Sequence, residues 1–165
     1  MVSMKYIAFC VLLMFLAVSA GMNGQPNQSG FSNASLSGTF SAREEGDGSV
    51  SAGLGLVYYD GKGKTTRRIR VNAPGSNGDR RILIFESEGT YNVNPDGTGT
   101  VFYTTRVSGG PVTNDSFDFV ITETENSWVP AAGVPRIGTE LFAAQREAGV
   151  TVSLITSLQK RIVRN

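Results

Sequence analysis

The sequence contains no histidine, and its single cysteine is Cys10, close to the first residue. The lack of histidine excludes Ser/His/Asp triads, Cys/His dyads, histidine metal sites and histidine general bases. Without a cysteine after residue 10 the rest of the chain has no disulfide, so its stability must come from a hydrophobic core. We predict no metal and no cofactor, which leaves carboxylates, arginines, hydroxyls and shape for any chemistry.

Long hydrophobic runs are missing as well. The apolar run at 6–18 has 13 residues, and it lies between Lys5 and the small residues Ser19 and Ala20. A membrane-spanning helix needs about 20 residues. A positive charge, a short apolar run and small residues in this order are typical of a secretory signal. We therefore predict a signal peptide over 1–20, cleavage near Ala20 and export as a secreted or periplasmic protein.

An excess of either charge is also absent. Lys5 is the only one of the 15 basic residues in the predicted signal, so 14 basic residues face 14 acidic ones in the remainder. This balance gives no argument for a nucleic-acid partner or for membrane insertion, and we predict neither. Residues 21–34 are mostly Gly, Asn, Gln, Ser and Pro, which predicts a disordered linker. Residues 35–165 have the usual size of one domain.

What the chain does have is period-two alternation broken by glycine-containing turns, which is typical of β-strands. The pattern predicts about eight strands, at 36–43, 50–59, 64–72, 81–93, 98–107, 116–122, 137–146 and 150–158. The turns at 60–63 and 94–97 have the Asp-Gly chemistry of hairpins, and 44–48 reads as a polar turn. Segment 140–148 also carries good helix formers, so a short helix is the alternative there.

Glycines interrupt the alternation at two places. Gly53 and Gly55 share one face of the second predicted strand, which suggests bending or close approach of another backbone. Ser87 and Gly89 interrupt the apolar face of the fourth, which suggests a bulge or bend.

Short turns without crossover helices predict that each strand pairs with its sequence neighbour. Closing such a meander removes its two edges, so we predict an all-β, eight-stranded antiparallel up-and-down barrel. A two-sheet β-sandwich is the alternative.

Several motifs carry a resemblance. Leu36-Ser37-Gly38-Thr39-Phe40, the turn at 59–64, the hairpin at 89–100 and the strand at 117–122 follow one another in this order. This order resembles a group of uncharacterised small exported bacterial proteins, whose organisation is similar to the calycin-type barrels of allene oxide cyclase and dirigent proteins. The resemblance implies a calycin-like barrel; it matches no catalytic residue and leaves the oligomeric state open.

The candidate ligand-binding residues are charged or aromatic and lie on the predicted strands or in the loop at 123–136. They are Tyr58, Arg68, Arg70, Glu86, Glu88, Tyr91, Tyr103 and Trp128. The two arginines share a strand face and could bind an anion, or they could pair with the two glutamates across the sheet. The glutamates could equally form a carboxylate pair. The tyrosines could line a pocket or fill the core, and Trp128 could cap a barrel mouth, anchor a partner or plug a packing gap.

These features suggest an exported barrel that binds a small apolar or amphipathic ligand, or a partner, without catalysis. An isomerase-like or cyclase-like enzyme for a hydrophobic substrate is the second hypothesis, and it needs a polar residue in the cavity. An outer-membrane barrel is the third. The charged end of the chain, from Lys160 to Asn165, argues against it.

Overall fold

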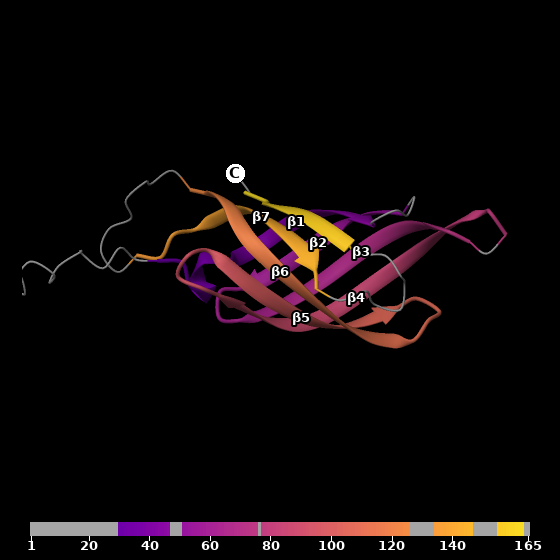
Figure 1. Ribbon diagram of the computed structural model, residues 1–165, viewed down its shortest axis with the longest axis horizontal. Helices are drawn as coiled ribbons and strands as arrows, with labels where there is room; N and C mark the ends of the chain where they lie inside the picture. The colour runs from indigo at the N-terminus through magenta and orange to yellow at the C-terminus, as the bar shows by residue number, and fades with distance from the viewer. Residues whose placement is uncertain (1–29, 47–50, 76, 126–133, 147–154, 164–165) are drawn as a thin grey trace, which may run out of the picture.

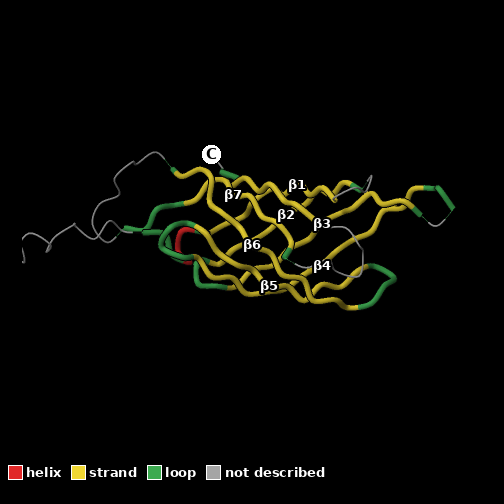
Figure 2. The backbone as a smooth tube through the Cα atoms, viewed as in Figure 1, coloured by secondary structure: helices red, strands yellow, loops and turns green. Residues whose placement is uncertain are grey.

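A computed structural model describes residues 30–46, 51–75, 77–125, 134–146 and 155–163. Strands make up most of this part of the chain, and one short 3₁₀ turn, η1, lies at one end (Figures 1 and 2). The elements are η1 (Asn33–Ser35), β1 (Ser37–Gly46), β2 (Ala52–Asp60), β3 (Lys64–Pro74), β4 (Arg80–Val93), β5 (Thr98–Val107), β6 (Val112–Thr124), β7 (Gly138–Gln145) and β8 (Ile155–Arg161).

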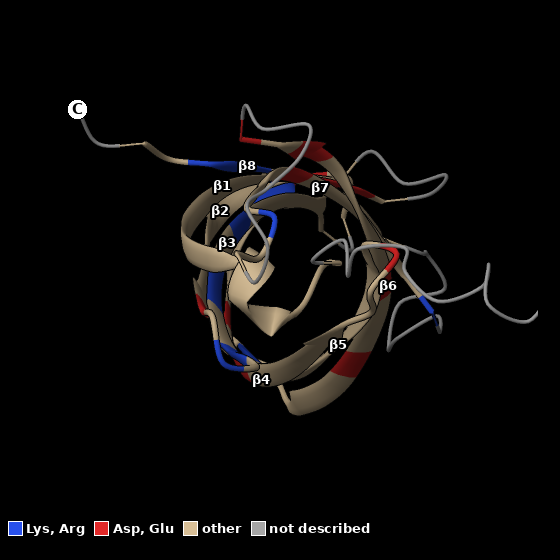
Figure 3. Cartoon of the chain, turned by 90° about the vertical axis from the view of Figure 1, so that its left-hand side faces the viewer, with Lys and Arg blue, Asp and Glu red and all other residues tan. Residues whose placement is uncertain are grey.

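The eight strands form a closed antiparallel barrel in sequence order. Each strand pairs with the next, and β8 returns to pair with β1, where Arg43 lies opposite Leu158. Figure 3 looks along the barrel and shows the complete ring. The predicted all-β up-and-down barrel is therefore confirmed, and the sandwich alternative is wrong. Within the described ranges, no helix has the length and apolar character needed to cross a membrane.

Most strand positions agree with the alternation pattern, but several details differ; β6, for example, begins at Val112 rather than 116. β1 continues through Glu44 and Glu45 to Gly46, where the sequence predicts a turn. The helix alternative at 140–148 is wrong as far as Gln145, because these residues belong to β7. The predicted turn after it lies outside the described residues. β8 ends at Arg161 rather than 158 because it pairs along β1 as far as Phe40.

Glycine decides which face of β2 points into the barrel. A Cβ at Gly55 would lie 2.1 Å from the carbonyl oxygen of Arg68 on β3, so only glycine allows this close approach. The same face carries the buried Val57 and Tyr59, whereas Leu54 and Leu56 point outward and are at least half exposed. The close backbone approach suggested by the sequence is confirmed here.

Gly89 of β4 has the same role, since a Cβ there would lie 2.1 Å from the carbonyl oxygen of Phe102. The pairing of β4 with β3 and with β5 passes through Ser87 and Gly89 without a register shift. A bulge at these residues, one of the two predicted possibilities, is therefore wrong. A register shift occurs instead in β6, after Ile121.

Aromatic rings and the segment just before β1, residues 30–36, fill one end of the barrel. Phe40, Tyr59 and Tyr91 pack edge to face, with ring centroids 5.4 and 5.0 Å apart. The Tyr91 hydroxyl donates to the carbonyl oxygens of Asn33 and Leu36, which ties η1 across the barrel end. Residues 30–34, which the sequence places in a linker, therefore belong to the folded end. We call it the sealed end.

Candidate functional site: the open end of the barrel

The opposite end of the barrel contains a cavity of about 450 Å³. Its walls come from the last residues of β1, β3, β5 and β7 and the first residues of β2, β4, β6 and β8. The chain connections at this end run between β1 and β2, β3 and β4, β5 and β6, and β7 and β8. Because the cavity lies here, we call it the open end. In Figure 2 it lies at the right, opposite η1, which is drawn in red.

The upper walls of the cavity are largely apolar. Strand alternation points every second side chain of each strand into the barrel, and six of those that line the cavity are large aliphatic or aromatic groups. They are Val71, Leu83, Phe85, Val107, Phe117 and Ile155. Three of them, Val71, Phe85 and Ile155, are partly buried and pack against the core. These three side chains therefore offer apolar surface that the described residues do not fully cover.

The inner boundary of the cavity is polar and centres on Arg67 of β3. The Arg67 guanidinium donates from Nε to Ser87 Oγ (3.2 Å), from Nη1 to Glu44 Oε1 (3.1 Å) and from Nη2 to Thr105 Oγ1 (3.4 Å). Asp115 of β6 adds a longer ion pair, with its Oδ2 3.7 Å from Nη2. The Arg67 side chain is 5% exposed, so this is an almost fully buried charged group.

Strand register explains why these groups meet. Arg67 lies directly opposite Ser87 in the β3–β4 pair, and Ser87 lies opposite Thr105 in the β4–β5 pair. The three side chains therefore form one inward row, and the hydroxyls of Ser87 and Thr105 are 2.9 Å apart. Glu44 and Asp115 reach the guanidinium from β1 and β6. We call Arg67, Glu44, Asp115, Ser87 and Thr105 the polar cluster.

Aromatic rings pack against the faces of the guanidinium. The Arg67 Cζ lies 4.4 Å from the centroid of the Tyr103 ring and 5.3 Å from that of Phe117. Cation–π contacts at these distances stabilise a cation that has lost its water. Arg67 is thus held by hydrogen bonds at its edge and by aromatic rings over its plane.

The electrostatics of the polar cluster are unbalanced, because two carboxylates surround one guanidinium. Burial raises the pKa of Glu44 above its usual range, the charge of Arg67 opposes that shift, and the charge of Asp115 adds to it. Burial likewise raises the pKa of the Tyr103 phenol. Within the described part of the chain, no group of three acidic, histidine or cysteine side chains is close enough to hold a metal ion.

Two hydroxyls behind the polar cluster, Thr65 Oγ1 and Tyr103 Oη, are buried and have no hydrogen-bond partner among the described residues. They face the barrel interior from β3 and β5, between the polar cluster and the sealed end. An unpaired buried hydroxyl costs about 1–3 kcal/mol. Polar groups therefore continue from the polar cluster toward the sealed end.

Comparisons of the chain with protein-family models, with curated proteins and with solved structures find no match.

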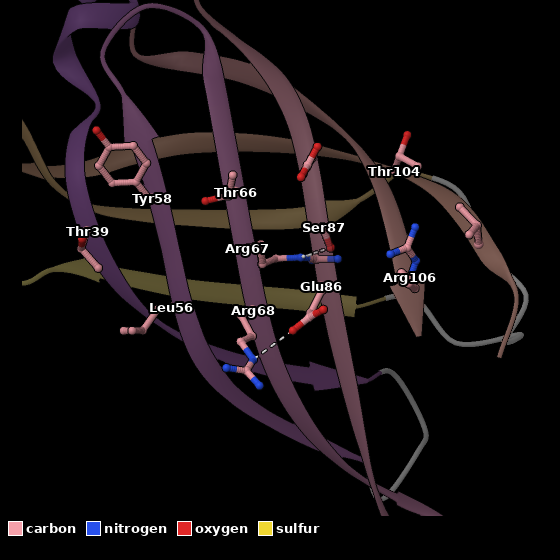
Figure 4. A pocket seen from close by; sticks show the side chains of 12 residues that line it. Thr39, Leu56, Tyr58, Thr66, Arg67, Arg68, Glu86, Ser87, Thr104 and Arg106 are labelled. Atoms are coloured by element: carbon pink, nitrogen blue, oxygen red, sulfur yellow. Dashed lines mark hydrogen bonds and ion pairs between the residues drawn. The ribbon is translucent and has the colours of Figure 1, made fainter. Parts of the chain in front are cut away.

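Four of the residues that the sequence singles out lie together, but on the outside of the barrel. Tyr58, Arg68, Glu86 and Glu88 line an open groove of about 710 Å³ on the outer face of β1–β6, and Figure 4 shows the first three. Arg68 Nε is 3.3 Å from Glu86 Oε1, and both side chains are more than half exposed. Of the two interpretations of these charges, the cross-strand ion pair is the one seen for Arg68 and Glu86.

The other candidates are dispersed. Arg70 is exposed and lies on the same outer face of β3 as Arg68. Tyr91 belongs to the sealed end, where its pKa is raised to about 12, mainly by burial. Tyr103 is buried in the barrel and covers Arg67. Trp128 lies outside the described residues. The structure thus brings four candidates together on an outer face, and none of the seven candidates that lie in its described part lines the cavity.

The residues of the polar cluster were missed as site residues. A signal for Arg67 exists in the sequence, because it alternates in phase with Thr65, Ile69 and Val71, all of which face inward. An arginine in such a series lies on the buried face and needs acidic or polar partners there. Glu44 was missed because it was placed in a turn.

Proposed function

We propose that this protein binds a small amphipathic molecule inside the open end of its barrel and does so without catalysis. The observation that carries the proposal is the cavity of about 450 Å³, whose apolar wall leads to a buried charged cluster. Ligand pockets of small molecules commonly measure about 300–1,000 Å³ and combine an apolar lining with a few placed polar groups. The cavity has both properties.

The apolar wall supplies affinity and the polar cluster supplies orientation. Each methylene group of a ligand that leaves water for the wall contributes about 0.8 kcal/mol. Polar groups at the inner boundary favour a ligand that enters with its polar end first and leaves its apolar part against Phe85, Val71 and Ile155. The outer groove supports ligand binding less well, because its Arg68–Glu86 ion pair is exposed to solvent, which screens its charges.

In this proposal the protein is exported and acts outside the cytoplasm. Its support is the order of Lys5, the apolar run at 6–18 and the small residues up to Ala20. Mass measurement of the protein from its native host tests this part separately. We expect a mature chain that begins near Gly21, and an intact residue 1 would contradict it.

The binding proposal is tested with N-phenyl-1-naphthylamine, an uncharged dye that fluoresces when it enters an apolar site. We expect saturable binding of one dye per chain. A Val71→Trp variant should lose most of the binding, because the larger side chain fills the cavity at its wall.

The matched control is Leu56→Trp, which adds the same bulk in the outer groove. This variant should bind the dye as the wild type does. No dye binding by folded wild-type protein, or equal loss in both variants, would contradict the cavity as the binding site.

A further inference from the structure

The polar cluster has more acceptor capacity than the protein uses. Glu44 Oε1 accepts from Arg67, and the only ion pair of Asp115 among the described residues is the 3.7 Å contact with Arg67. The second oxygen of Glu44 and both oxygens of Asp115 have no hydrogen-bond donor in the part of the chain that the structure describes. Both carboxylates line the cavity.

Arg67, in contrast, is already surrounded by protein groups. Three of its five N–H groups donate to Ser87, Glu44 and Thr105, and Tyr103 and Phe117 lie within cation–π distance of its guanidinium. A ligand carboxylate or phosphate that used the other N–H groups would lie next to the carboxylates of Glu44 and Asp115. Like charges at such distances repel strongly where water is excluded.

The other charged residues that line the cavity in the described part of the chain do not reverse the balance. Arg81 and Glu45 also line the cavity, but both are exposed at its rim, where solvent screens them, and they have opposite signs. Glu45 is further paired with Arg43. The inner part of the cavity therefore holds one positive and two negative groups, and a cationic donor is what completes it.

We infer that the ligand of this cavity carries a protonated amine, which donates hydrogen bonds to Glu44 and Asp115 while its apolar part contacts the wall formed by Phe85 and its neighbours. An ammonium group has three N–H donors and no acceptor, which matches the three carboxylate oxygens that accept no hydrogen bond from the described residues. This inference rests on the proposed function and specifies the chemical class of the ligand.

Three probes that share one apolar chain test the inference. Protonated n-octylamine, uncharged n-octanol and octanoate are titrated against the bound naphthylamine dye. We expect n-octylamine to displace the dye at about one tenth of the n-octanol concentration or less, which corresponds to about 1.4 kcal/mol or more. Octanoate should be the weakest of the three.

Variants identify the groups responsible for this order. In Glu44→Gln and Asp115→Asn, n-octylamine should lose most of its advantage over n-octanol measured in the same variant. Glu86→Gln, which removes a carboxylate from the outer groove, should leave the order unchanged. The wild-type comparison alone decides the inference if a variant does not fold.

The outcomes separate the two proposals. If n-octanol displaces the dye and n-octylamine has no advantage, or octanoate binds most tightly, the amine inference is overturned and the apolar cavity stands. If the dye itself does not bind to the folded protein, the proposed function fails first. An advantage of n-octylamine that survives in both carboxylate variants also overturns the inference.

Discussion

Arg67 and Arg68 show how strongly a shift of one position along a strand changes the burial of a side chain. The two residues are neighbours in β3, yet the Arg67 side chain is 5% exposed and the Arg68 side chain 68%. The Arg67 side chain points into the barrel, so its ion pair with Glu44 is buried. The Arg68 side chain points outward, so its ion pair with Glu86 is exposed. Exposed pairs contribute about 0–1 kcal/mol, whereas breaking a buried pair costs about 3–5 kcal/mol.

The first prediction concerns the raised pKa of Glu44. Because burial raises this pKa in the folded protein, the folded state binds the proton of Glu44 more tightly than the unfolded state does. The contribution of Glu44 to the free energy of unfolding is therefore largest below its usual pKa of about 4.5 and is lost as pH rises through the folded value. Relative to Glu44→Gln, the wild type should become less stable as pH rises.

Urea unfolding of both proteins at several pH values between about 5 and 8 measures this difference. Asp60 and Asp96, whose pKa values are lowered by hydrogen bonds, make the opposite contribution, which is lost as pH falls below about 4. They are present in both proteins, so their effect cancels in the comparison. A difference that does not change with pH would contradict the prediction.

The second prediction concerns Gly55. Gly55→Ala places a Cβ 2.1 Å from a carbonyl oxygen and 2.8 Å from the Cα of Ile69, and both are backbone atoms that cannot turn away. We expect a loss of about 1–3 kcal/mol in the free energy of unfolding. At Gly110 the nearest atom to an added Cβ is 3.4 Å away, so Gly110→Ala should cost no more than about 0.5 kcal/mol. Equal effects of the two changes would contradict the packing argument.

At the scale of single elements, the segment before β1 has the clearest structural role. Phe31 donates its backbone N–H to the carbonyl oxygen of Pro95, and its ring lies next to Gly97. The Asn33 side chain accepts from the backbone N–H of Val93 at 2.8 Å. Both contacts attach the segment to the end of the β4–β5 hairpin. Residues 30–36 are therefore a structural part of the sealed end.

Asn33→Ala tests this role. The change leaves the partly buried N–H of Val93 without its acceptor, so we expect a loss of about 1–3 kcal/mol. Asn114→Ala removes an exposed side-chain hydrogen bond to Thr104 and should change stability by no more than about 0.5 kcal/mol. Chemical denaturation measures both, and a neutral Asn33→Ala would contradict a stabilising role of the Asn33 side chain.

The sequence predicts the elements better than the site, and the reason is physical. Alternation and turn chemistry are local, so β5 is predicted with its observed limits at Thr98 and Val107. Which face points inward depends on neighbouring strands. The face of β2 with Leu54 and Leu56 looks like the core face, but contact with β3 requires glycine on the other one. The polar cluster depends on register across five strands, which no local pattern contains.

At the scale of the whole molecule, stability depends on the closing pair of β8 with β1. These strands are more than a hundred residues apart in sequence, as in the hydrogen bond from Ser41 Oγ to the carbonyl oxygen of Lys160. Contacts of this range form late and slow the folding of β proteins. β8 also pairs with β7, so it is the only strand that joins the beginning of the barrel to its end.

A chain that ends at Arg146 lacks β8 and should not form the folded barrel. Its loss exposes the edges of β1 and β7, which then pair with other chains. We expect aggregation or the loss of cooperative unfolding, measured by size-exclusion chromatography and circular dichroism. A chain that ends at Ile162 keeps all of β8 and should behave as the full-length protein does. A soluble, cooperative protein ending at Arg146 would contradict the role of closure.

The sealed end has a kinetic consequence. With Phe40, Tyr59 and Tyr91 filling one end, a molecule bound at the polar cluster enters and leaves through the same opening, and its last methylene groups stay closest to water. Lengthening an apolar tail then makes it protrude rather than clash. Residence time should grow with tail length only until the tail reaches the rim, and beyond that point extra carbons should leave the dissociation rate unchanged.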